Sequence, residues 1–73
     1  MTLLEAPIGS RVRIQQLHPH PATAIRLREL GFSENAVVRC VLKSHGNIIC
    51  EICNTRIGLN GLVARNILVS IPG

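Results

Sequence analysis

Residues 22–32 form the one convincing helical segment in a chain otherwise made of short runs of β-forming residues. Thr23, Leu27 and Leu30 recur at the spacing of a 3.6-residue period, which predicts one helix face turned toward a core. Gly31 follows the last predicted turn, where a glycine can take the left-handed conformation that ends a helix. We therefore expect the rest of the chain to fold as strands around this helix.

Five short runs of aliphatic and β-branched residues predict strands. They occupy residues 11–15, 37–43, 48–53, 56–59 and 67–71. Asn60 is placed to cap a single helical turn over residues 61–66. Short strands joined by tight turns around an aliphatic core are typical of a small, partly open barrel. We therefore expect one mainly β domain over residues 1–73.

The predicted strands also carry specific expectations about their faces and turns. Alternation places Val38, Cys40 and Leu42 on one face of the second strand. A turn at residues 54–55 is expected to connect the third and fourth strands. Gly58, inside the fourth strand, is typical of a β-bulge or of a close approach by another backbone.

Composition limits both the core and the class of partner. The chain has 73 residues, 47% of them hydrophobic, with one Phe and no Trp or Tyr, so the core must be aliphatic. A core this small stabilises a fold only marginally, and a partner or self-association surface would supplement it. The net charge of +4 comes from seven Arg and one Lys that are scattered rather than clustered. Scattered charge without aromatic residues for base stacking disfavours nucleic-acid binding.

No segment has the pattern of a secretion signal or of a membrane span. Residues 1–7 are interrupted by Glu5 and Pro7, and no apolar run is long enough to cross a bilayer. Three cysteines are an odd number and imply no disulfide framework. We therefore expect a cytoplasmic protein without direct membrane insertion.

Cys50 and Cys53 have a C-x-x-C spacing that invites a metal or redox interpretation. In a strand, residues three apart point to opposite faces, so both thiolates cannot reach one ion. Cys50 shares its face with apolar neighbours, as Cys40 does, and both are predicted to be buried small hydrophobes. Cys53, beside a turn, is predicted to be an exposed thiol. No cofactor and no resident metal are expected.

The histidines are the remaining candidates for metal binding. His18 and His20 lie in a proline-rich segment before the helix, and imidazole is a ligand of divalent iron. A transition-metal-binding domain that uses His18, His20 and Cys53, with His45, is therefore an alternative. The serines and glutamates are dispersed and no glycine loop for phosphate is present, so no catalytic residue is expected.

The outward face of the predicted helix is the best candidate for a partner surface. Ile25 projects roughly opposite Leu27, and Arg26, Arg28 and Glu29 surround it. An exposed isoleucine flanked by charges is a plausible docking point for another protein. We therefore expect partner contacts on this face.

Residues 26–32, Arg-Leu-Arg-Glu-Leu-Gly-Phe, resemble the R-L-x-E-L-G-hydrophobic signature of the FeoA family. The beginning of the chain, with Pro7-x-Gly9 before an alternating strand, and its end, with I-x-L and A-x-x-I-x-V, resemble the same family. The expected core and family-signature residues are Val12, Ile14, Leu27, Leu30, Gly31, Phe32, Leu59, Ala64, Ile67 and Val69. The departures from the family pattern fall in loops, at residues 18–21, 35 and 60–61.

The resemblance implies an SH3-like barrel with a helix inserted after the first strand, in agreement with the elements predicted above. It also implies no catalytic activity and an accessory role in bacterial ferrous-iron uptake. The implied partner is the cytoplasmic region of the membrane transporter FeoB, which carries a GTPase domain. A homo-oligomer, a transition-metal-binding domain and a small basic nucleic-acid-binding barrel stay open as alternatives.

Overall fold

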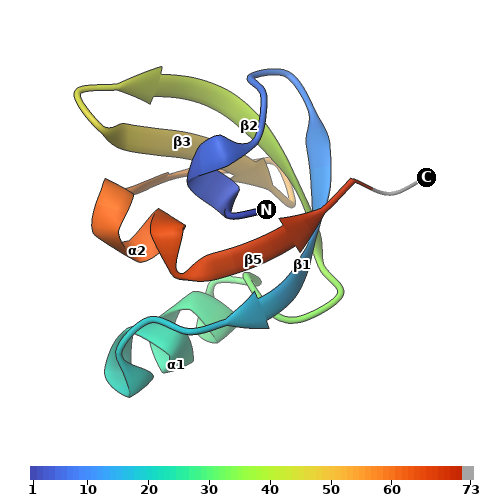
Figure 1. Cartoon of the computed structure of the whole chain (residues 1–73). Helices are drawn as coiled ribbons and strands as arrows, with labels where there is room; N and C mark the ends of the chain where they lie inside the picture. Colours follow the sequence, from blue (N-terminus) through green and yellow to red (C-terminus); the bar gives the residue numbers. More distant parts are fainter. Residues whose placement is uncertain (72–73) are drawn as a thin grey trace.

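The computed structural model describes residues 1–71, which form one antiparallel five-stranded sheet curled around an aliphatic core (Figure 1). The elements in chain order are the 3₁₀ turn η1 (Leu3–Glu5), β1 (Arg11–Leu17), α1 (Pro21–Glu29), β2 (Val37–Ser44), β3 (Asn47–Ile52), β4 (Thr55–Leu59), α2 (Gly61–Arg65) and β5 (Ile67–Ser70). The order of strands in the sheet is β4-β3-β2-β1-β5. The mainly β barrel with one helix after the first strand and a helical turn before the last confirms the predicted fold class.

The core is built from the inward residues of all five strands. Three segments outside the sheet add apolar side chains to it: η1 with its cap, α1 with the turn that follows, and α2. Its buried hydrophobic cluster consists of Leu3, Ala6, Val12, Ile14, Leu17, Leu27, Phe32, Val38, Cys40, Ile48, Cys50, Ile52, Leu59, Ala64, Ile67 and Val69. Within residues 1–71 no polar or charged residue is buried. The fold is therefore held by aliphatic packing and by the backbone ladder, as the composition predicts.

Helix α1 begins and ends at residues whose backbone suits those places. Pro21 occupies its first turn, where the missing N–H is not needed. Gly31 has a φ of +97°, so the chain turns sharply after the helix. The backbone N–H of Phe32 then donates to the carbonyl of Leu27 at 2.8 Å. This reversal returns Phe32 to the core, where its side chain is fully buried.

The buried face of α1 differs from the predicted one. Ala24 and Leu27 are buried and Thr23 is half-buried, whereas Leu30 is 54% exposed. The prediction that Leu30 faces the core is wrong, because α1 ends at Glu29 and Leu30 only caps it. Since the chain reverses at Gly31, the core space beyond Leu27 is filled from the next segment instead.

A bulge in β2 changes which residues face the core. Cys40 pairs with Cys50, but Leu42 pairs with Ile49, so β2 advances by two residues while β3 advances by one. The additional residue, Val41, shifts the alternation of side chains. Leu42 is therefore 50% exposed on the outer face, and its predicted place beside Cys40 is wrong.

The β3–β4 hairpin turns one residue earlier than predicted. Cys53 and Asn54 both have positive φ, of 50° and 63°, as in a two-residue type I′ turn. Thr55 is therefore the first residue of β4 rather than part of the turn. The bulge or close approach predicted at Gly58 is also absent, because β3 and β4 pair without a register shift and a Cβ at Gly58 would meet nothing within 4 Å.

Helix α2 is a short helix before the last strand, as predicted. The side-chain Oδ1 of Asn60 accepts a hydrogen bond from the backbone N–H of Val63 at 2.8 Å. Gly61, its first residue, lies so close to the β2–β3 turn that a Cβ at Gly61 would overlap the carbonyl oxygen of Gly46. A residue without a side chain is therefore needed at this position for α2 to lie so close to the turn.

Candidate functional site

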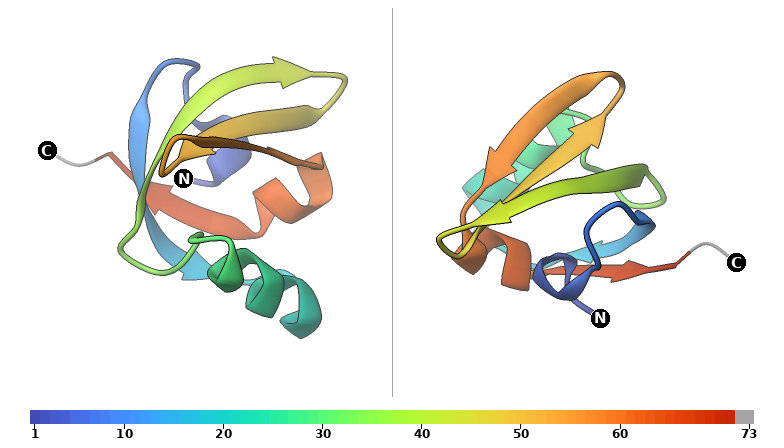
Figure 2. Two further views of the ribbon diagram at one scale, coloured as in Figure 1. Left: turned by 180° about the vertical axis from the view of Figure 1, so that it is seen from behind. Right: turned by 90° about the horizontal axis from the view of Figure 1, so that it is seen from above.

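Helix α1 lies at one end of the barrel, with one face on the core and the other directed away from it (Figures 1 and 2). Ile25 is 56% exposed, and Arg26 and Glu29 are exposed beside it. At 3.6 residues per turn, Ile25, Glu29, Arg26 and Leu30 follow one another around this outward arc. The arc therefore presents two apolar side chains with one charge of each sign between them. We call these four residues the α1 surface.

Arg28 is engaged within the chain rather than held free for a partner. Its Nη2 lies 3.0 Å from Oε2 of Glu34, and its Nε donates to Oε1 at 3.3 Å. This two-pronged ion pair connects the last turn of α1 to the loop that follows it. Of the four helix residues predicted to contact a partner, Arg28 thus has a partner inside the chain. The two other charged residues of the set, Arg26 and Glu29, have no ion-pair partner within residues 1–71.

The ion pair predicts a measurable pH effect at Glu34. The hydrogen bond from Arg28 lowers the pKa of the Glu34 carboxyl from its ordinary value. A carboxyl with a lowered pKa in the folded state stabilises the fold above its unfolded-state pKa, and this contribution is lost as pH falls through the folded-state pKa. NMR titration of the side-chain carboxyl carbon should give a lowered pKa in the wild type and a higher one in Arg28→Ala, where only a backbone hydrogen bond still lowers it. An unchanged pKa in Arg28→Ala would show that the ion pair does not form in solution.

A groove lies between the segment before α1 and helix α2. It has a volume of about 260 Å³ and is lined by His18, Pro19, His20, Thr23, Leu62, Val63 and Asn66. The backbone N–H of His18 donates to the carbonyl of Asn66 at 2.7 Å, which holds the two walls together. Sequence reasoning missed the α2 wall, because nothing local indicates that residues so distant in sequence pack side by side.

The structure brings His18 and His20 to this groove but leaves Cys53 elsewhere, at the β3–β4 turn. Nε2 of His18 is 2.6 Å from Oε1 of Gln16, and Nδ1 of His20 accepts a bond from the Ala22 N–H at 3.3 Å, so each imidazole already has a partner. Within the described residues no three His, Cys, Asp or Glu side chains gather as a metal would require. The alternative metal set of His18, His20 and Cys53 is therefore not assembled.

Two of the three cysteines face each other inside the core. Cys40 and Cys50 are register partners on β2 and β3, and both are fully buried. The neighbouring Cys40 thiol raises the pKa of Cys50 and burial raises it further, whereas the same pairing lowers the pKa of Cys40 to about 7. Their complete burial confirms the predicted packing of Cys40 and Cys50 in the core, and Cys53 is exposed as predicted.

Comparison with known proteins identifies the family. A family model described as the FeoA domain matches residues 1–71. The chain belongs to the FeoA family. The comparison with curated proteins gave no match. No helix in residues 1–71 is both long and apolar enough to span a membrane.

Solved FeoA structures share the fold. The FeoA protein of Chlorobium tepidum superposes with a TM-score of 0.93 over 100% of this chain and 71% of its own, at 23% identity. The iron(II) transport protein A of Clostridium thermocellum gives 0.86 over 97% of this chain and 45% of its own, at 26% identity. Stenotrophomonas maltophilia FeoA, in complex with zinc, gives 0.80 over 96% and 89%, at 32% identity. That protein is described as an SH3 domain protein and as a candidate ferrous-iron transport activating factor.

Proposed function

We propose that this FeoA-family chain is a non-enzymatic accessory protein of ferrous-iron uptake that binds the cytoplasmic region of a FeoB-like membrane transporter. The observation that carries this proposal is the match to the FeoA family over residues 1–71. The relative from S. maltophilia, described as a candidate activating factor of ferrous-iron transport, supports the same role. The chain would act in the cytoplasm, where that region of the transporter lies.

The α1 surface is the contact that we propose for the transporter. Ile25 and Leu30, each a little over half exposed, supply the apolar area that a docked partner would bury. Complete burial of an exposed side chain of this size is worth about 1.5–3 kcal/mol, so each of the two would contribute about half of that. Arg26 and Glu29 lie between them and would fix orientation through charge, which contributes more to specificity than to affinity. Arg28 would contribute indirectly, because its ion pair with Glu34 fixes the end of the helix.

Binding alone is sufficient for this role. No catalytic residues are expected in the chain, and its buried groups within residues 1–71 are all apolar. Any effect on the transporter would therefore come from the differential affinity of the chain for the transporter's conformations.

Uptake of ferrous iron by cells tests the proposal. Cells that lack the gene should take up ferrous iron slowly and regain the wild-type rate when the wild-type chain is restored. The Ile25→Glu variant should fail to restore it, because a charge at that position cannot be buried against the transporter. Ile8→Glu, a matched change at a side chain 50% exposed outside α1, should restore uptake fully. Normal uptake without the gene would refute the accessory role, and full restoration by Ile25→Glu would refute the α1 surface.

A further inference from the structure

The two edges of the sheet differ in how they are covered. Beside β5, Thr2 forms a bridge with Leu68, and the backbone N–H of Val69 donates to the carbonyl of Met1 at 2.8 Å. Beside β4 there is no such cover: β4 pairs with β3 alone, and no backbone hydrogen bond from elsewhere in residues 1–71 reaches it. Figure 2 shows β4 (orange) at the end of the sheet. β4 is thus the uncovered edge.

The turn geometry determines which groups of β4 point outward. In a two-residue hairpin the two residues that flank the turn form a hydrogen-bonded pair. Along the strands, hydrogen-bonded and non-hydrogen-bonded pairs then alternate. The backbone groups of Thr55, Ile57 and Leu59 therefore form hydrogen bonds to β3. The N–H and C=O groups of Arg56 and Gly58 point away from the sheet. Both residues are exposed. The edge lacks two of the usual protections, since β4 contains no proline and pairs without a bulge, and its one charged side chain is Arg56.

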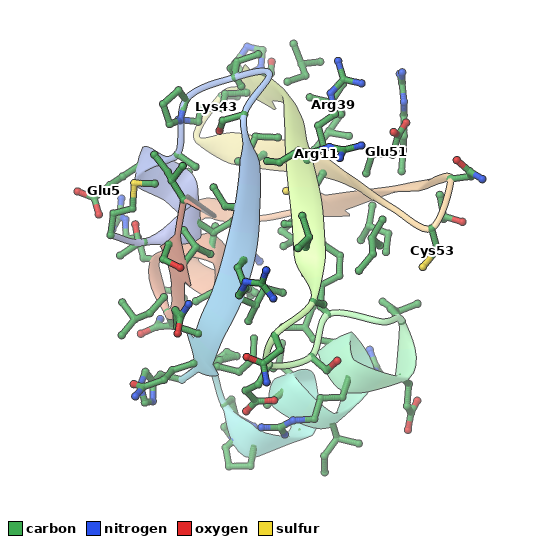
Figure 3. The ribbon with its side chains drawn as sticks, turned by 90° about the vertical axis from the view of Figure 1, so that its right-hand side faces the viewer. Glu5, Arg11, Arg39, Lys43, Glu51 and Cys53 are labelled. Carbon is green, nitrogen blue, oxygen red and sulfur yellow. The ribbon has the colours of Figure 1, made fainter. Side chains whose placement is uncertain are left out.

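A row of charges runs across the outer face of the sheet to this edge. Arg11, Arg39, Glu51 and Arg56 are successive register partners on β1, β2, β3 and β4. Nε of Arg56 lies 3.7 Å from Oε2 of Glu51, whereas Arg11 and Arg39 have no ion-pair partner within residues 1–71. Figure 3 shows Arg11, Arg39 and Glu51 gathered on one side. With three positive charges and one negative charge, the row would be complemented by a carboxylate beyond Arg56.

A second row of residues, apolar rather than charged, runs beside the first across the outer face of the sheet. At the β4 edge it ends at a glycine, which has no side chain. Leu42, Ile49 and Gly58 are register partners on β2, β3 and β4. Leu42 is half exposed, Ile49 is partly buried, and Gly58 has no side chain to continue the row. Because a Cβ at Gly58 would meet nothing within 4 Å, the space above Gly58 can hold a large side chain from a neighbouring strand.

We propose that the outward edge of β4 binds an extended segment of a partner protein, which adds an antiparallel strand to the sheet. Since the segment runs opposite to β4, it carries an aromatic residue opposite Gly58 and, two residues later, an acidic residue opposite Arg56. The recognised pattern is thus aromatic-x-acidic within a strand, with affinity supplied by backbone bonds and selectivity by the two side chains. This docking site is separate from the α1 surface and does not depend on the proposed function.

Charge favours a foreign segment over a second copy of the chain. An antiparallel pair of β4 strands centred on Ile57 would place Arg56 opposite Gly58 of the second copy, so neither β4 strand would bring a carboxylate to the other's arginine. The chain also carries a net charge of +4, which opposes self-association. A segment with the aromatic-x-acidic pattern complements both rows, whereas β4 of a second copy supplies neither an aromatic nor an acidic side chain.

A capped peptide of sequence Thr-Thr-Tyr-Thr-Glu-Thr-Thr is the probe that tests this site. In an NMR titration of the isotope-labelled chain, it should shift the amide signals of Arg56 and Gly58 and slow their hydrogen exchange. Replacing the Glu of the peptide with Lys, or the Tyr with Ala, should each weaken binding at least tenfold. Absence of binding at millimolar peptide, equal affinity for the three peptides, or shifts confined to other surfaces would overturn the proposal.

Variants of the chain test separately the acidic contact at Arg56 and the aromatic contact at Gly58. Arg56→Glu should reverse the preference, so that the Lys peptide binds more tightly than the Glu peptide. Gly58→Val should keep the fold, because β-branched residues suit exposed strands, yet weaken binding of the Tyr peptide at least tenfold by filling the space above residue 58. Arg65→Glu, an equal charge change at an exposed site in α2, should bind like the wild type. Unchanged binding by Arg56→Glu and Gly58→Val, or a dimer formed through β4 without peptide, would refute the site.

Discussion

Replacing Phe32 with alanine is expected to lower the free energy of unfolding by about 3–5 kcal/mol, the range for removal of a buried aromatic side chain. Phe32 is fully buried and is the largest fully buried side chain of the core. At roughly 0.05–0.15 kcal/mol per residue, a chain of 73 residues has about 4–11 kcal/mol of stability, so the variant should lose about a quarter of it or more. Equilibrium unfolding in urea, followed by circular dichroism, measures the loss.

Phe32→Leu is the matched control, because it retains most of the apolar volume and should cost only about 1–1.5 kcal/mol. A loss below about 1 kcal/mol in Phe32→Ala would contradict the packing described here. It would show that the reversal at Gly31 does not place Phe32 in the core.

Gly61→Ala is expected to destabilise the fold, although alanine favours a helix over glycine by about 1 kcal/mol. The reason is tertiary, because a Cβ at Gly61 would overlap the backbone carbonyl oxygen of Gly46, and neither group belongs to a flexible side chain. Overpacking of this kind costs about 1–3 kcal/mol. In a domain of this size each kcal/mol lowers the melting temperature by about 4–8 °C, which differential scanning calorimetry resolves easily.

Gly58→Ala provides the contrast for this prediction. Its Cβ would meet nothing within 4 Å, so replacement of glycine in a strand should be neutral or stabilising by up to about 1 kcal/mol. A Gly61→Ala variant as stable as Gly58→Ala would contradict the close approach of α2 to the β2–β3 turn.

Local sequence signals predict most of the fold because they are strong where the chain is regular. Alternation in β1 places Val12 and Ile14 inward, and both are fully buried. Gly31 and Asn35 have the positive φ that their residue types predict, at 97° and 73°. Asn60 caps α2, as its type and position indicate. Where the backbone is regular or a residue type has a special conformation, the pattern is therefore informative.

The errors arise where a distant partner decides the local structure. Leu42 reaches the outer face because a bulge opposite β3 shifts the alternation, and a period-two count cannot detect one added residue. Leu30 is exposed because the helix ends a residue earlier than its apolar pattern suggests. The role of Gly61 depends on Gly46, which is remote in sequence. These features follow from tertiary packing, which periodicity does not encode.

The same distinction applies to the candidate sites. The outward residues Ile25, Arg26 and Glu29 are visible from helix periodicity alone, and all three are exposed in the structure. The commitment of Arg28 to Glu34 requires the loop after α1 to be placed. The rows that end at β4 require the pairing of four strands, so no local pattern reveals them.

Direct binding to the transporter tests the central claim. Isothermal titration of the purified chain against the cytoplasmic region of a FeoB-like transporter should show a saturable complex. Ile25→Glu should weaken it at least tenfold, since the lost contact and the buried charge act together, while Ile8→Glu should leave it unchanged. Failure of the folded wild-type chain to bind would contradict the proposed function, and equal affinity of both variants would contradict the α1 surface.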